Sequence, residues 1–502
     1  MLLQPAAAEG FRPGAALAMA AWEGRREQSA GHFTPSWKLR RRSLRTLFLP
    51  PLFLFLFGLA FFLHAQPPPR HGASVGTKRI CTPRFARRGG GAAPNDWSEH
   101  GDVPWPGGRS GPAVWPSADG GLFALGGMGY SGAPAGSDRP NAPRQRPTNH
   151  LSDAWRWVPA PGAAAATAPG SFVHLGGLAT TATGDTMGAL GRYNGNLQWP
   201  GGRDVAMTWL DPTDGALLLF GGWGYGDGRT THKAGDLGDL WRLHLEGAKS
   251  GAAHAEFLGG GKDTNEPGSV HWPGARYGGV TWSLPAGGGL FLFGGQGYPL
   301  DSAEAKKVVG AVRSSFQASE SAKGGPVYGD LNDLWSLRRA GGSEVEFQML
   351  GGSAGTNALG RYSSDAKGGQ WPGARSGCGR WHVEAAGAAP VLLLFGGWGF
   401  NAVKDDRLND VWALHPPAVQ GSAKPELRSK KAESSAATAV FLGGRREGGV
   451  GSVYAEHAAW PGSRTYPASF TAGGSHLLFG GFGFGEAGTD AEERIGRLAD
   501  LW

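Results

Sequence analysis

Short apolar runs that end in paired glycines recur along most of the chain. Each follows an aromatic residue and a polar or glycine-rich turn, and each is four to seven residues long. Runs of this length, bounded by Gly and Pro, are typical of β-strands and too short for buried helices. Five such runs occupy residues 123–127, 217–222, 290–295, 391–397 and 477–481.

The same larger unit surrounds every run. Trp-Pro-Gly-x-Arg precedes it, and Asp-x-Trp follows it. The distance from the first Trp to the second Gly is 21 to 26 residues, whereas the distance from that Gly to Asp-x-Trp ranges from 13 to 38. The first spacing indicates a hairpin and the second a surface loop. The repeated arginines are Arg109, Arg203, Arg276, Arg375 and Arg464.

Four of the units add a further apolar piece that ends in Gly-Gly, so each unit predicts four strands, a to d. A four-stranded antiparallel sheet exposes two apolar faces, and packing like sheets around an axis buries both. We therefore expect an all-β propeller of about five blades. The Gly-Gly of strand b should permit close approach near the axis. Repeated aromatic residues should fill the spaces between blades, and the Asp before Trp should cap a turn through backbone N–H groups.

This unit resembles the kelch-repeat family of β-propellers. The marks are Leu-Phe-Gly-Gly, the Leu-Asn-Asp-Leu-Trp of residues 331–335 and the Trp-Pro-Gly-Ala-Arg of residues 272–276. The resemblance covers residues 83–502, with units 73 to 99 residues apart, about twice the family's usual length. It implies that the five repeated arginines lie near the mouth of a central channel and bind an acidic ligand. The alternative is that each bonds carbonyls or the Asp of its own blade.

The last unit stops at Trp502 without a strand d. Residues 85–90, Phe-Ala-Arg-Arg-Gly-Gly, lie fifteen residues before the first unit's Trp, at Trp105, a spacing that suits a strand d. We expect this segment to complete the last blade and close the ring. The alternative is that the sequence is truncated and its remaining blades are missing, which would make six.

Residues 47–63, from Leu47 to Leu63, are almost wholly apolar and follow the cluster of Lys38, Arg40, Arg41, Arg42 and Arg45. They predict a helical transmembrane signal anchor with a cytosolic N-terminus. Residues 1–46 then form a basic, disordered tail, residues 64–82 a Pro-rich stem, and the propeller faces the lumen or the outside. Secretion after cleavage near Ala65 and an organelle leader are the alternatives.

The charge distribution and the cysteine content exclude some classes of partner and of site. Residues 1–90 carry a net charge of +11 and residues 91–502 a net charge of −4, so we expect no nucleic-acid binding. Two cysteines, Cys81 and Cys378, cannot build a disulfide framework or a cysteine zinc site. We expect two unpaired thiols, with a single Cys81–Cys378 disulfide as the alternative.

No catalytic motif accompanies the repeat, so we expect no cofactor and no metal. The favoured function is a non-catalytic scaffold that recognises a protein or a glycan. Selectivity is expected in two b–c loops, 131–150 with Arg139, Arg144 and Arg146, and 299–329. Gln296 breaks an otherwise aromatic or Met position. The alternatives are a galactose-oxidase-like copper-radical oxidase, with Cys378 on a strand a, and a glycan-processing accessory domain.

Overall fold

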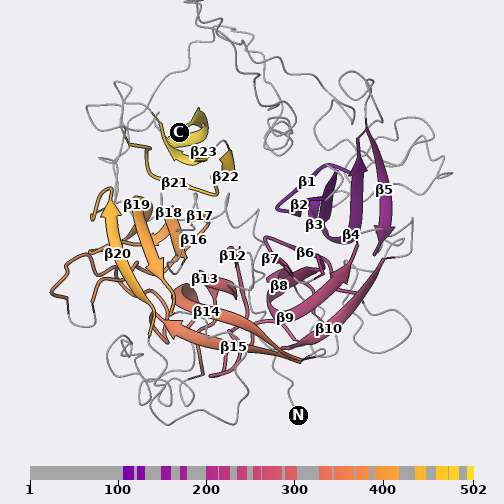
Figure 1. The fold of residues 1–502 in the computed structure, drawn as a ribbon, viewed down its shortest axis with the longest axis horizontal. Helices are drawn as coiled ribbons and strands as arrows, with labels where there is room; N and C mark the ends of the chain where they lie inside the picture. The colour runs from indigo at the N-terminus through magenta and orange to yellow at the C-terminus, as the bar shows by residue number, and fades with distance from the viewer. Residues whose placement is uncertain are drawn as a thin grey trace, which may run out of the picture.

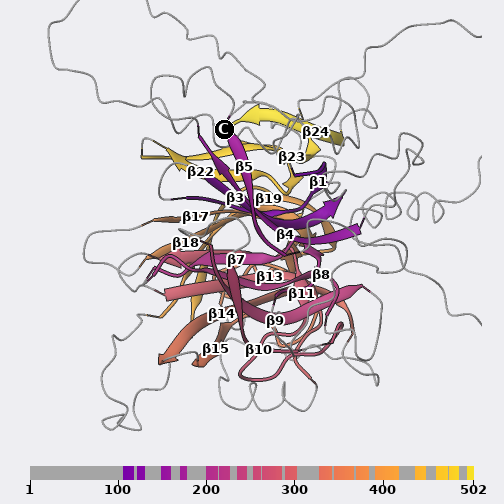
Figure 2. The same ribbon diagram turned by 90° about the vertical axis from the view of Figure 1, so that its right-hand side faces the viewer.

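The computed structural model describes residues 106–502 apart from gaps, of which the longer are 130–148, 160–169, 178–198, 227–233, 246–252, 302–326, 384–389, 418–435, 448–459 and 486–494. The described residues form five antiparallel sheets placed around one axis, which is a five-bladed β-propeller (Figure 1). The all-β class is confirmed. Figure 2, turned by 90°, shows strands such as β7 and β13 running roughly along that axis.

Each of the first three blades contains the predicted strands a to d, with strand a divided into two short pieces that both pair with strand b. Blade 1 comprises β1 (Arg109–Ser110), β2 (Ala113–Pro116), β3 (Leu122–Gly129), β4 (Asn149–Val158) and β5 (Ser171–Gly176). Blade 2 comprises β6 (Arg203–Asp204), β7 (Met207–Leu210), β8 (Leu217–Gly224), β9 (Gly235–His244) and β10 (His254–Gly260). Blade 3 comprises β11 (Arg276–Tyr277), β12 (Val280–Leu284), β13 (Gly289–Gly297), β14 (Gly329–Gly341) and β15 (Glu344–Gly351).

The last two blades follow the same order. Blade 4 comprises β16 (Arg375–Ser376), β17 (Gly379–Val383), β18 (Val391–Phe400), β19 (Asp405–His415) and β20 (Thr438–Gly443). Blade 5 comprises β21 (Arg464–Thr465), β22 (Ala468–Ala472), β23 (Ser475–Phe484) and β24 (Ile495–Leu501). Within the described residues, blade 5 has strands a, b and c.

A chain of backbone hydrogen bonds joins the blades where strand a divides. The dividing residue has a positive φ in every blade, at 63° for Gly111, 51° for Val205, 65° for Gly278, 64° for Gly377 and 50° for Tyr466. Each of the last four donates its N–H to the carbonyl oxygen of the one before it, over 2.7 to 3.1 Å. The inner strands are thus tied to one another in sequence order around the axis.

The Gly-Gly of strand b has the expected role. The first glycine has a φ of 59–63° and the second of 97–104° in all five blades. A Cβ on Gly126 would lie 2.6 Å from the carbonyl oxygen of Arg203, and one on Gly221 would lie 2.5 Å from that of Arg276. Only glycine tolerates this conformation and this approach of the next blade's backbone together.

Aromatic side chains fill the spaces between blades, as predicted. Three apolar clusters each combine two neighbouring blades: 1 with 2, 2 with 3, and 3 with 4. The Trp of strand a reaches forward, since Trp209 Nε1 donates to the Phe291 carbonyl at 2.8 Å and Trp282 Nε1 to the Trp381 carbonyl at 2.8 Å. These bonds satisfy indole groups that burial would otherwise leave unpaired.

In blades 2 to 5, the Trp of Trp-Pro-Gly reaches back to the preceding blade. Its Nε1 donates to the carbonyl oxygen of the residue before Asp-x-Trp, over 2.6 to 2.9 Å. The Gly-Gly of strand d leaves room for the indole ring. A Cβ on Gly351 would lie 2.5 Å from Trp371 Cη2. The second Gly-Gly pair is therefore a platform for the next blade. The four indoles belong to Trp199, Trp272, Trp371 and Trp460.

Several expectations fall on residues that the structure does not describe. They are the tail at 1–46, the anchor at 47–63, the stem at 64–82 and the closing strand at 85–90. In the part of the chain that is described, no helix is long and apolar enough to span a membrane.

Candidate functional site

Each repeated arginine forms a two-point ion pair with the Asp of the Asp-x-Trp in its own blade. Nη1 donates to Oδ1 at 2.6 Å in every blade, and Nη2 donates to Oδ2 at 2.7 to 3.0 Å. Parallel bonds of this kind are the strong geometry for guanidinium and carboxylate. The pairs are Arg109–Asp153, Arg203–Asp239, Arg276–Asp333, Arg375–Asp410 and Arg464–Asp500.

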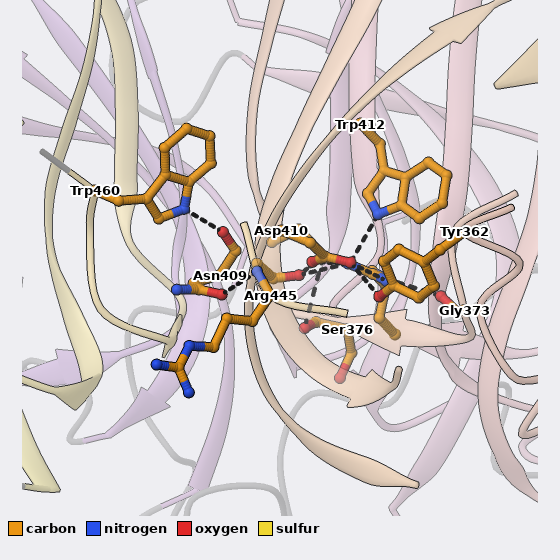
Figure 3. A network of polar contacts seen from close by, with 11 residues as sticks. Tyr362, Gly373, Ser376, Asn409, Asp410, Trp412, Arg445 and Trp460 are labelled. Atoms are coloured by element: carbon orange, nitrogen blue, oxygen red, sulfur yellow. Dashed lines mark hydrogen bonds and ion pairs between the residues drawn. The ribbon is translucent and has the colours of Figure 1, made fainter. Parts of the chain in front are cut away.

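Further bonds complete the arrangement in blade 4 (Figure 3). Arg375 also donates to the carbonyls of Gly373 and Gly396, at 2.9 and 3.2 Å. Asp410 Oδ2 accepts from the Trp412 indole at 2.7 Å and from the Tyr362 hydroxyl at 2.6 Å. The neighbouring carboxylate raises the pKa of Arg375 above its usual value, although desolvation opposes this.

These contacts correct the prediction for the repeated Asp and show which groups the repeated arginines bind. The Asp carboxylates accept hydrogen bonds from Arg and Trp side chains, where capping by backbone N–H groups was expected. The repeated arginines are largely buried and bonded within their own blades. A ligand role for them stays a prediction. Arg139, Arg144 and Arg146 lie outside the described residues.

The residues that break the repeat gather next to these ion pairs. Three positions differ from blade to blade: the residue after the repeated Arg, the residue after Gly-Gly, and the residue three before the Asp of Asp-x-Trp. Backbone pairing places the three side by side in the sheets of blades 2 and 3. In blades 2 and 3 they carry acidic, amide and aromatic side chains. We use the name polar cluster for Tyr328 and five of these residues: Asp204, Asp236, Tyr277, Gln296 and Asp330.

The polar cluster has hydrogen bonds within blade 3 and contacts to residues of the preceding blades. The Tyr277 hydroxyl donates to Gln296 Oε1, and the Tyr328 hydroxyl donates to the Tyr277 oxygen at 3.3 Å. Tyr277 lies edge-on to Trp223 of blade 2, with ring centroids 5.9 Å apart. Asp204 Oδ1 lies 3.4 Å from His150 Nδ1 of blade 1.

Burial dominates the electrostatics of the polar cluster. Desolvation raises the pKa of Asp330 to about 8, although Ser376 and Arg375 oppose the shift. It raises the pKa of Asp236 well above the usual value, and Arg276 opposes it. Neither carboxylate oxygen of Asp236 has a hydrogen-bond partner within the described part of the chain. Buried acids of this kind favour the protonated form and can donate as well as accept.

Tyr466 extends from blade 5 toward the same region. Its ring would contact a Cβ on Gly377 at 2.9 Å, and its hydroxyl one on Gly278 at 2.9 Å. Its side chain thus lies over the inner strands of blades 4 and 3. Although Tyr466 is 40% exposed, desolvation by the surrounding protein, together with the neighbouring Asp204, Asp330 and Cys378, raises the pKa of its hydroxyl above the usual value.

Cys378 is buried and free, with Sγ 3.3 Å from the Gly396 carbonyl oxygen. Burial raises the pKa of its thiol to about 12, so it is protonated at neutral pH. Cys81 lies outside the described residues. Among the side chains that the structure does describe, no group of three His, Cys, Asp or Glu is placed to hold a metal ion.

Sequence reasoning expected the repeat to be broken mainly in the loops. Of the polar cluster it identified Gln296, and Asp204 as the only acid that directly follows a repeated arginine. The others were visible as well. Aligning the five units on Arg and on Asp-x-Trp brings Asp204 and Tyr277 into one column and Asp236 and Asp330 into another. The chemical variation within those columns was the available signal.

Comparison with known proteins gives only a distant structural similarity. No protein-family model matches the chain, and no curated protein matches it. A solved structure, that of YjhT, is similar with a TM-score of 0.38 and 11% identity, over 79% of this chain and 81% of that chain. At this level the likeness carries no conclusion about activity or ligand. The structure itself establishes a five-bladed β-propeller, and membership of the kelch-repeat family stays a prediction.

Proposed function

We propose that the protein is a non-catalytic recognition scaffold of the kelch type, which binds a protein or a glycan ligand. One observation carries the proposal. Residues that repeat in every blade, such as the Arg–Asp pairs, bond to one another within the propeller. The residues that differ between blades are hydrogen-bonding and aromatic groups that cluster beside the b–c loops. Ligand sites commonly combine aromatic surface with a few polar groups held on a rigid frame.

Membrane attachment is part of the proposal. The apolar stretch at 47–63 and the basic residues before it support a signal anchor in the secretory pathway, with the propeller lumenal or extracellular. Protease treatment of intact microsomes should leave the propeller undigested until detergent is added. Digestion without detergent would contradict this topology, and a mature chain starting near Gln66 would favour secretion after cleavage.

The ligand-binding face can be tested with the full chain on protein and glycan arrays. Reversing the charge of Arg139, Arg144 and Arg146 in the b–c loop of blade 1 should weaken capture of the ligand and leave the melting temperature unchanged. Reversing Glu344 and Glu346 is the control, because both are exposed on β15 near the c–d turn, at the opposite end of the antiparallel strands. Equal effects of both changes, or no ligand on either array, would refute the proposal.

The copper-radical oxidase remains the alternative. Metal analysis of the purified protein separates the two functions: stoichiometric copper together with a tyrosine crosslinked to Cys378 would assign the chain to the oxidases.

A further inference from the structure

Arg380 is a charged residue at a position where the other blades have small neutral ones. It lies on β17 opposite Leu394 of β18. The matching register of the other blades identifies its equivalents, and these second pieces of strand a surround the axis (Figure 1). Among these five equivalent positions, only that of blade 4 carries a guanidinium. The equivalents are Val114, Thr208, Thr281 and Ser469.

Hydrogen bonds to the neighbouring blades hold Arg380 in place. Its Nη1 donates to Thr281 Oγ1 of blade 3, which in turn donates to the Thr208 carbonyl of blade 2 at 2.6 Å. Its backbone N–H donates to Ser469 Oγ of blade 5 at 3.0 Å. These are neutral partners. Within the described residues, no carboxylate pairs with this guanidinium.

The charge of Arg380 is poorly compensated. The side chain is partly exposed, yet the surrounding protein desolvates it enough to lower its pKa to about 10. Arg375, five residues earlier on the same inner strand, has Asp410 as a counter-ion. A desolvated cation without a counter-ion costs folding free energy, and an anion that binds it removes part of that cost.

We propose that Arg380 binds the carboxylate group of a small organic acid at the propeller axis. The planar guanidinium matches a carboxylate through two parallel hydrogen bonds. A single uncompensated positive charge suits a monoanion, because a phosphate dianion would leave surplus negative charge inside the protein. Neighbouring Thr and Ser residues at the equivalent positions suit an acid that also carries hydroxyl groups, such as a hexuronic acid.

The site is separate from the face assigned to the protein or glycan ligand. Strand a of blade 4 begins with Arg375 beside the b–c loops and runs away from them, so Arg380 lies toward the a–b end. Loss of ligand capture at the b–c loops and loss of carboxylate binding at Arg380 are therefore distinguishable failures.

Thermal unfolding and calorimetry of the full chain test the proposal with three probes: sodium acetate, sodium glucuronate and neutral glucose, at constant ionic strength. At least one carboxylate should raise the melting temperature of the wild-type protein, and glucose should not. Arg380→Gln should weaken that binding by about tenfold or more, the effect of losing a charged hydrogen-bonded partner. Because the variant loses an uncompensated, partly desolvated charge, its melting temperature without probe should be equal to or above that of the wild type.

Arg445→Gln is the matched control, since Arg445 is exposed and the same charge is removed. It should retain the carboxylate response. No carboxylate-dependent stabilisation of the wild type would overturn the proposal, and so would an equal response in Arg380→Gln.

Discussion

Arg375 and Asp410 are joined by two hydrogen bonds, of 2.6 and 3.0 Å, and neither side chain is exposed to solvent. The pair connects strand a to strand c across strand b within one blade. The same connection in the other four blades makes it the main polar link between the inner strands of each sheet.

Removing one partner of this pair should be costly. Arg375→Ala leaves the Asp410 carboxylate buried with fewer donors, and it leaves the Gly373 and Gly396 carbonyls without the guanidinium. The expected loss is about 3–5 kcal/mol in the free energy of unfolding, measured by urea denaturation. Arg445→Ala, at an exposed position, should change it by less than about 0.5 kcal/mol. Similar values for the two variants would contradict a structural role for the pair.

The glycine platform beneath each Trp-Pro-Gly indole gives a second prediction. In Gly351→Ala the new Cβ would lie 2.5 Å from Cη2 of Trp371, which is itself almost fully buried and bonded to Asn332. Because the ring has little room to move, we expect a loss of about 1–3 kcal/mol in the free energy of unfolding.

Gly496→Ala is the control for this change. It also adds a Cβ within a strand, on β24, but nothing lies within 4 Å of that Cβ. It should be neutral or stabilise by up to about 1 kcal/mol. Equal destabilisation by the two variants would show that backbone conformation, and not contact with Trp371, governs the effect.

The sequence predicts the features of this fold that depend on the residues of a single repeat unit. Apolar runs gave the strands, the constant spacing gave the hairpin, and Gly-Gly gave the positive φ near the axis. Contacts between units were harder to predict. That Val205 and Tyr466 adopt a positive φ follows from hydrogen bonds to neighbouring blades, and their side chains give no sign of it.

The candidate site was less predictable for the same reason. The significance of Asp330 depends on its burial against Ser376 of the next blade, and that of Arg380 on the absence of an acid among its described neighbours. Burial and pairing across a blade boundary are properties of the assembled ring, whereas motif spacing reports on one unit at a time.

Asp330 predicts a pH dependence of stability. Burial raises its pKa in the folded protein to about 8, with Asp405 adding to the shift, whereas an unfolded Asp has a pKa of about 3.9. The folded state therefore keeps a proton that the unfolded state releases. The stabilisation from this group is complete below about pH 4, declines as pH rises, and is lost above about pH 8.

Urea unfolding between pH 5 and 9 can isolate this contribution. Asp330→Asn cannot ionise, so the free energy of unfolding of the wild type should fall relative to that of the variant from pH 5 to 8, then run parallel to it. Parallel curves across the whole range would mean that Asp330 ionises normally in the folded protein.

The last prediction concerns the closing strand expected at 85–90. Strand-d leucines that precede Gly-Gly pack against the next blade: Leu175 is 0% exposed and Leu350 is 4% exposed. Leu442, at the equivalent position of blade 4, is 53% exposed. The described residues of blade 5 have no strand d to cover it. Residues 85–90 carry the Phe and the Gly-Gly that this strand would need.

Two substitutions in that segment should then differ sharply. Phe85 aligns with Phe172 and Phe347, which are buried, so Phe85→Asp should lower the free energy of unfolding by about 3–5 kcal/mol. Ala86 aligns with Glu256 and Gln348, where polar side chains already occur in strand d, so Ala86→Asp should cost less than about 1 kcal/mol. Hydrogen exchange of β24 should accelerate in the first variant only, because its outer edge would lose the pairing strand. If both variants match the wild type in stability and exchange, the segment does not pair with β24.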